Sequence, residues 1–168
     1  ADPTTANGIS INTGVTLTVT TSGGGGGAIT YTANTQANAQ TITMNGTGGI
    51  TAVSLSIPAP TSTGSSLVTC AGSATGTASF SGAVSITGNS TSTGAVTLGM
   101  LTCTLSVSGL LTITGGTNST GSASLTTSSG TLTMSAGLTF GGTAANAKLT
   151  GTSSATLNLS GTVSSGGT

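Results

Sequence analysis

Very few residues of this chain carry a side chain that could take part in acid–base, metal or nucleophilic chemistry. The 168 residues include one lysine, Lys148, one acidic residue, Asp2, and no histidine. Tyr31, Cys70 and Cys103 are the other side chains that can titrate. A general acid or base needs a group that titrates near neutral pH, and a metal site needs clustered His, Cys or carboxylate ligands. We therefore expect no enzyme, no metal and no cofactor.

The near absence of charge excludes further classes of function. Charged residues are 1% of the chain, whereas about 25% is usual for soluble domains. One lysine cannot neutralise a row of phosphates, so we expect no nucleic-acid partner. The sequence also contains no apolar run near the roughly 20 residues that a membrane span requires. Because almost nothing titrates, stability is expected to be nearly the same at acid and neutral pH.

A surface without charge needs another means of staying hydrated, and four asparagines could supply it. Each begins an Asn-x-Ser/Thr triplet, the acceptor for N-linked glycans in secreted proteins: Asn45, Asn89, Asn118 and Asn158. A chain rich in serine and threonine also produces such triplets by chance. We expect covalent glycans at these positions, since three of them lie in Gly/Ser/Thr-rich turn segments and Asn158 alternates with two leucines.

The two cysteines favour the same extracellular setting. Cys70 and Cys103 each fall in phase with neighbouring apolar residues, which places both thiols on an inward face of a strand. Two buried cysteines in an extracellular chain most often form a disulfide. The alternative is a pair of free thiols that pack as small hydrophobic side chains.

The elements that position these residues are predicted to be strands. Bulky apolar residues of the first segment all occupy odd positions: Ile9, Ile11, Val15, Leu17 and Val19. Alternation of this kind predicts one long strand with a single apolar face. Five glycines follow at 23–27, a run that behaves as a flexible coil. We therefore divide the chain into a tail at 1–22 that donates a strand, a glycine hinge at 23–27 and a head domain at 28–168.

The head continues as short alternating strands separated by Gly, Ser and Thr clusters, with almost no helical periodicity. This pattern predicts an all-β fold, and we interpret it as an immunoglobulin-like, pilin-like sandwich of two packed sheets. A β-solenoid is the alternative, and stretches such as residues 130–138 are similar to the coils of secreted adhesins and ice-binding proteins. Solenoids usually show a fixed repeat, and the spacing between turns here is irregular.

The arrangement of an alternating N-terminal strand before a Ser/Thr/Gly-rich head resembles bacterial chaperone–usher type 1 pilins. The lack of charge and the several glycan acceptors resemble more closely the thread filament subunits of acid-living archaea. This resemblance implies a secreted, glycosylated subunit, its signal peptide already removed, that polymerises with identical subunits into a cell-surface filament. Ile9, Ile11, Val15, Leu17 and Val19 would then be the donor residues that complete the next subunit, and the filament would serve adhesion or biofilm formation. The alternative function is a monomeric β-solenoid adhesin or ice-binding domain.

Overall fold

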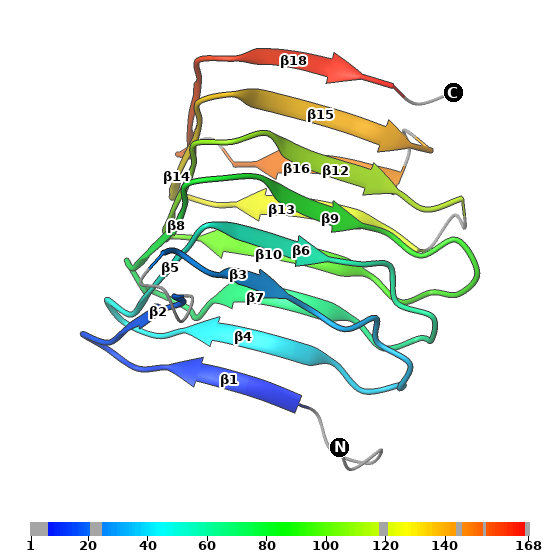
Figure 1. Cartoon of the computed structure of the whole chain (residues 1–168), viewed down its shortest axis with the longest axis horizontal. Coiled ribbons are helices and arrows are strands. Elements are labelled where there is room, and N and C mark those ends of the chain that lie inside the picture. The colour runs from blue at the N-terminus through cyan, green and yellow to red at the C-terminus, as the bar shows by residue number, and fades with distance from the viewer. Residues whose placement is uncertain (1–6, 21–24, 118–120, 144–145, 153, 167–168) are drawn as a thin grey trace.

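The computed structural model is a parallel β-solenoid, in which the chain winds through three sheets in turn (Figure 1). The structure describes residues 7–20, 25–117, 121–143, 146–152 and 154–166. Every pairing between named strands in this part is parallel, and each strand pairs with the strands three places before and after it in chain order. Three successive strands therefore make one coil, from coil 1 (β1–β3) to coil 6 (β16–β18).

The three sheets are numbered here by the order in which the chain meets them. Sheet 1 contains β1 (Asn7–Ile11), β4 (Gln40–Met44), β7 (Ser66–Cys70), β10 (Val96–Leu101), β13 (Ala123–Thr127) and β16 (Ala147–Gly151). Sheet 2 contains β2 (Thr16–Thr18), β5 (Gly49–Ala52), β8 (Thr77–Phe80), β11 (Thr104–Val107), β14 (Thr131–Met134) and β17 (Thr156–Leu159). Sheet 3 contains β3 (Ala28–Thr30), β6 (Ser54–Ile57), β9 (Val84–Thr87), β12 (Leu111–Gly115), β15 (Gly137–Gly142) and β18 (Thr162–Ser165).

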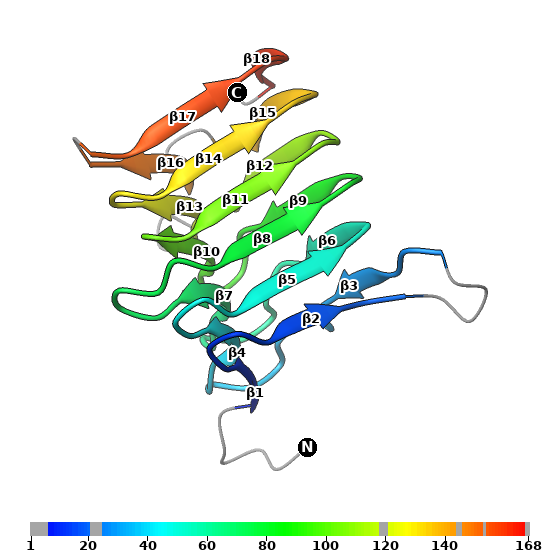
Figure 2. The same cartoon turned by 90° about the vertical axis from the view of Figure 1, so that its left-hand side faces the viewer.

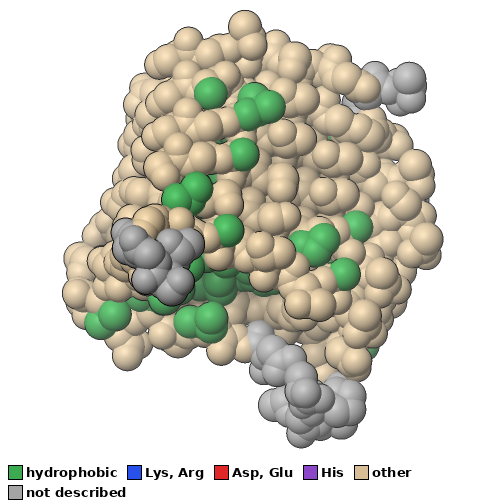
Figure 3. Space-filling view, in the orientation of Figure 1, with side chains coloured by type: hydrophobic (Ala, Val, Ile, Leu, Met, Phe, Trp, Pro, Cys, Tyr) green, Lys and Arg blue, Asp and Glu red, His purple; other side chains and the backbone are tan. Residues whose placement is uncertain are grey.

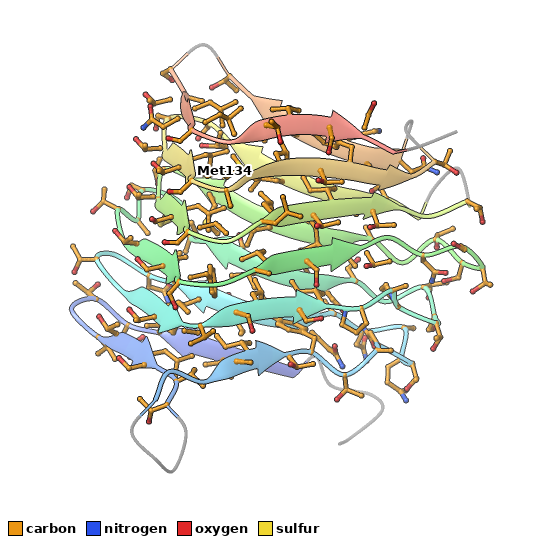
Figure 4. All side chains as sticks on the ribbon, turned by 45° about the horizontal axis from the view of Figure 1, so that its top comes forward. Met134 is labelled. Atoms are coloured by element: carbon orange, nitrogen blue, oxygen red, sulfur yellow. A yellow bond between two sulfur atoms is a disulfide. The ribbon has the colours of Figure 1, made fainter. Side chains whose placement is uncertain are left out.

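The core is a set of apolar columns that run along the solenoid axis. Because the strands pair in register, inward residues of neighbouring coils stack directly on one another, as Leu105 stacks on Leu132 and Leu111 on Leu138. Side chains of all three sheets fill the interior, including Met134, which ends β14 and is fully buried (Figure 4). This stacking lets a chain with few large apolar residues bury most of them, since each inward residue of a middle coil contacts its counterparts in the coils above and below.

Glycine is needed at corners where backbones of adjacent coils approach closely. A Cβ built on Gly76 would lie 1.8 Å from the backbone oxygen of Gly48 in the preceding coil. A Cβ on Gly116 would lie 1.8 Å from the backbone oxygen of Asn89. Any side chain at these positions would push two coils apart, which accounts for part of the high glycine content.

The expected immunoglobulin-like or pilin-like sandwich is wrong, although the all-β prediction agrees with the structure. The sequence hides the repeat because the coils differ in length. Ser66, Val96, Ala123 and Ala147 stack in successive coils of sheet 1, yet they are separated by 30, 27 and 24 residues. Corners of variable length absorb these differences, so the register between strands is regular while the spacing in the sequence is not.

The donor-strand interpretation is also wrong. Residues 9–19 form two strands joined by a corner at Gly14, and not one long strand. β1 pairs with β4 and β2 pairs with β5, so Ile9, Ile11 and Leu17 belong to coil 1 of their own chain. Val19 packs against the same core, while Val15 lies exposed at the corner. β1 and β2 of the expected tail pair with β4 and β5 of the expected head, so the strand pairing crosses the boundaries that we expected between tail, hinge and head. Residues 23–24 of the glycine run lie outside the described residues.

Candidate functional site: the hydroxyl face of sheet 2

The outward face of sheet 2 carries two columns of hydroxyl side chains. In each strand the outward residues flank one inward residue, as Thr131 and Thr133 flank the buried Leu132. Register pairing aligns them into a first column of Thr16, Gly49, Thr77, Thr104, Thr131 and Thr156 and a second column of Thr18, Thr51, Ser79, Ser106, Thr133 and Asn158. Ten of these twelve positions are therefore threonine or serine. We call this surface the hydroxyl face.

The columns form a two-dimensional array with a fixed repeat. Neighbouring strands in a sheet lie about 4.8 Å apart and outward residues of one strand about 6.7 Å apart. Figure 2 views this sheet from outside and shows its strands stacked with little change of direction. Threonine suits such an array because its branched Cβ restricts χ1 and so fixes where the hydroxyl and methyl groups point.

One interruption of the first column has a steric cause. A Cβ on Gly49 would lie 2.8 Å from the backbone oxygen of Thr77, in the next coil. A threonine cannot occupy this place without moving β8, so the column loses one hydroxyl near its N-terminal end.

The other two faces are less regular. On sheet 1, Leu67 and Lys148 interrupt one outward column, and Gly99 interrupts the other. Sheet 3 has one complete hydroxyl column: Thr30, Ser56, Ser85, Thr112, Thr139 and Ser164. Figure 3 views the molecule from the side on which sheet 3 lies and shows apolar patches between polar atoms. One apolar residue on this side is Leu110, which is exposed directly before β12. Only sheet 2 presents two adjacent hydroxyl columns without an apolar or charged side chain among the outward positions.

The hydroxyls of sheet 2 also remain available to an external partner. On sheet 3, Ser85 lies 3.4 Å from Ser56, and Thr139 lies 3.0 Å from Ser164, in hydroxyl–hydroxyl hydrogen bonds. On sheet 1, Thr97 and Ser124 are similarly joined at 3.3 Å. Among the described residues of the hydroxyl face, the one side-chain hydrogen bond is from Asn158 Nδ2 to Thr133 Oγ1, at 3.5 Å. The hydroxyls of this face can therefore direct their donors and acceptors outward.

The titratable side chains that the structure describes lie away from this surface. Lys148 is exposed on the outer face of sheet 1, where it follows Ser124 in its column. Tyr31 follows β3, and its hydroxyl donates to the backbone oxygen of Leu67 at 2.6 Å. Burial raises the pKa of the Tyr31 hydroxyl above its ordinary value. Asp2 lies outside the described residues. The hydroxyl face is thus uncharged, and any recognition by it depends on shape and neutral hydrogen bonds.

The predicted disulfide is confirmed. Cys70 ends β7 and Cys103 precedes β11, so the bond joins neighbouring coils at the corner between sheets 1 and 2. The two Cα atoms lie 6.1 Å apart and both side chains are buried. The bond closes a loop over 33 positions of sequence and fixes one coil against the next.

The four predicted glycan acceptors lie in different surroundings. Asn158 is exposed on the hydroxyl face, and Asn45 is partly buried, with its Nδ2 donating to Ser10 Oγ at 2.9 Å. Asn89 is 1% exposed, and its Nδ2 donates to the backbone oxygen of Ser62 and to Ser92 Oγ. A glycan on Asn89 would have to break these bonds and leave the interior. Asn118 lies outside the described residues, and glycosylation at all four positions stays a prediction.

Sequence reasoning did not find this face. Thr16-Leu17-Thr18 and Thr131-Leu132-Thr133 are visible in the sequence, but Thr77-Ala78-Ser79 is inconspicuous among similar triplets. The signal that could have found the face is the recurrence of a hydroxyl–apolar–hydroxyl triplet every 27 residues over β8, β11 and β14.

The fold and the hydroxyl face define this chain as a parallel β-solenoid protein with one flat, neutral surface of repeated hydroxyl groups. Comparison with models of protein families, with curated proteins and with solved structures finds no match. Nothing in these comparisons identifies a thread filament subunit, and that resemblance stays untested. Among the described residues no helix is long and apolar enough to cross a membrane.

Proposed function

We propose that this protein is an ice-binding β-solenoid whose working surface is the hydroxyl face of sheet 2. The observation that carries the proposal is the pair of aligned hydroxyl columns, ten hydroxyls over twelve positions in register. Their repeat of about 4.8 by 6.7 Å is close to the separations of water molecules on the prism surfaces of ice. Hydroxyl groups at this repeat can hold water in positions that continue the crystal, while the threonine methyl groups restrict that water's freedom.

Two further features support this proposal over adhesion to sugars or proteins. Sugar-binding surfaces commonly stack aromatic rings on the sugar, and aromatic residues make up 2% of the chain, with none among the twelve positions of the hydroxyl face. A neutral face offers no charge complementarity to a protein partner. The disulfide supports an oxidising, extracellular setting, in which contact with ice would take place.

Coil 4 offers one matched position on each face to test the proposal. Thr97, Thr104 and Thr112 lie on sheets 1, 2 and 3, and all three are half-buried. We expect Thr104→Tyr to reduce thermal hysteresis and the inhibition of ice recrystallisation at least about fivefold, because the ring stands above the array and keeps ice from the neighbouring hydroxyls. Thr97→Tyr and Thr112→Tyr are the controls, and both should retain wild-type activity.

Circular dichroism and the melting temperature of each variant separate lost binding from lost folding. Absence of thermal hysteresis in the wild type would overturn the proposal. An equal loss of thermal hysteresis in all three folded variants would reject sheet 2 as the ice-binding face.

A further inference from the structure

The two ends of the solenoid present complementary unfinished surfaces. At the C-terminal end, no strand within the described part of the chain pairs with the outer side of β16, β17 or β18, and three inward-facing side chains of coil 6 are exposed: Leu157 by 45%, Leu159 by 36% and Val163 by 55%. At the N-terminal end, Ile9 of β1 is 52% exposed. Each of these residues stacks on a buried apolar residue of the adjacent coil, and none of the described strands lies on its other side.

Two of the three strands at the C-terminal edge, β17 and β18, contain no proline, lysine or bulge, while β16 carries Lys148. Natural edge strands are protected by proline, lysine, bulges or covering loops. β17 and β18 contain only Thr, Leu, Asn, Val and Ser, and their pairing with β14 and β15 is regular. Their outer N–H and C=O groups therefore form a template for another parallel strand.

The N-terminal end is shaped to receive such an edge. A hollow of about 410 Å³ opens between β1, β3 and β4, and its apolar lining includes Ile9, Ile29 and Ile42. This space can take aliphatic side chains of the size of leucine or valine. Among the described residues, the hollow carries no charged side chain. The C-terminal edge carries one, Lys148, which points outward from β16.

We infer that the C-terminal coil of one molecule stacks end to end on the N-terminal coil of a second copy. The columns of the solenoid would continue across this contact, with Leu157 against Leu17 and Val163 against Ile29 of the second copy. The outer columns would continue as well, with Thr156 beside Thr16 and Asn158 beside Thr18. Each chain keeps all its own strands. The contact joins two different surfaces, so it can repeat.

This inference rests on the proposed function in one respect, because stacking would lengthen the hydroxyl face without a break. A longer array binds more water positions at once, so activity per chain should rise with association. Association itself can be measured without ice, which allows the two proposals to fail separately.

The first test is the mass of the protein in solution as a function of concentration. Sedimentation velocity of the wild type should show the 15.5 kDa chain at low concentration and multiples of it at high concentration. Leu157→Lys should stay a single chain throughout, because a charge cannot be buried at the contact. Leu110→Lys is the matched control, since Leu110 is 42% exposed on the side of the solenoid, and it should associate as the wild type does.

The second test identifies which ends meet. Chains carrying Asn158→Cys and chains carrying Thr18→Cys, distinguished by mass, should cross-link to each other under mild oxidation, and neither should cross-link to itself. The native disulfide is buried and does not interfere. A wild type that remains one chain at all concentrations, equal behaviour of Leu157→Lys and Leu110→Lys, or self-linked Asn158→Cys would each overturn the inference. Ice binding by a monomeric wild type would leave the proposed function standing.

Discussion

At the scale of single residues, buried asparagines fix the corners between sheet 3 and sheet 1. Asn89 Oδ1 accepts hydrogen bonds from the backbone N–H groups of Thr91 at 2.7 Å and Ser92 at 3.0 Å. Asn34 is fully buried in the corresponding corner two coils earlier, where its Oδ1 accepts from the N–H of Gln36 and its Nδ2 donates to the backbone oxygens of Asn38 and Ser65. These two buried side chains thus provide hydrogen-bond partners for backbone groups of the corners.

Replacing Asn89 by alanine should therefore destabilise the protein by about 2 to 3 kcal/mol, because buried N–H and C=O groups would lose their partners. Urea denaturation measures this change. Asn158→Ala is the control, since Asn158 is exposed, and its free energy of unfolding should change by less than about 0.5 kcal/mol. Equal stability of the two variants would contradict the role given to Asn89.

Tyr31 should make stability sensitive to alkaline pH. Its pKa is raised by burial above the ordinary value of 10.0. The folded state therefore holds the proton more firmly than the unfolded state does, and stability is present in full below pH 10 and declines above it. Thermal midpoints between pH 8 and pH 11 should show this decline in the wild type but not in Tyr31→Phe. A decline of equal size in both proteins would show that another group is responsible.

At the scale of elements, the corners decide how closely the coils stack. Gly76→Ala should destabilise the solenoid by at least about 2 kcal/mol, because the added Cβ meets the backbone of coil 2 and nothing flexible can yield. Gly141→Ala is the matched change within a strand, where the nearest atom, Thr114 Oγ1, lies at 3.5 Å. We expect Gly141→Ala to be neutral or to stabilise by about 0.5 to 1 kcal/mol. The two variants are compared by their melting temperatures. A larger decrease in melting temperature for Gly141→Ala than for Gly76→Ala would contradict the packing described here.

The strands themselves were predictable from the sequence, but the corners were not. Pairs such as Leu132 with Met134 and Leu138 with Phe140 mark β14 and β15 directly. Alternation can continue through a corner of one or two residues, however, so residues 50–57 are typical of one long strand although the chain turns at Val53 between β5 and β6. The same ambiguity made residues 9–19 look like a single strand, and it favoured a sandwich with a donor strand over a solenoid.

The candidate site was beyond sequence reasoning for a related reason. Thr104 and Thr131 become neighbours only when β11 is paired with β14, and that pairing depends on corner lengths that no local pattern specifies. The disulfide was easier to predict from the sequence, because each cysteine lies in phase with apolar neighbours in its own segment.

At the scale of the whole molecule, the lack of charge should make the fold indifferent to acid. Lys148 is the one charged side chain among the described residues, so no carboxylate within that part must be protonated before the protein unfolds in acid. Thermal midpoints at pH 2 and pH 7 should agree within a few degrees by calorimetry. A collapse of the folded state at pH 2 would contradict this expectation.

The most direct test of the central claim is to watch where the protein binds on a single crystal of ice. Fluorescently labelled wild-type protein should be incorporated into a growing crystal on defined planes that match the repeat of the hydroxyl face, while labelled Thr104→Tyr should be excluded. Exclusion of the folded wild-type protein from every plane of the crystal would contradict the account.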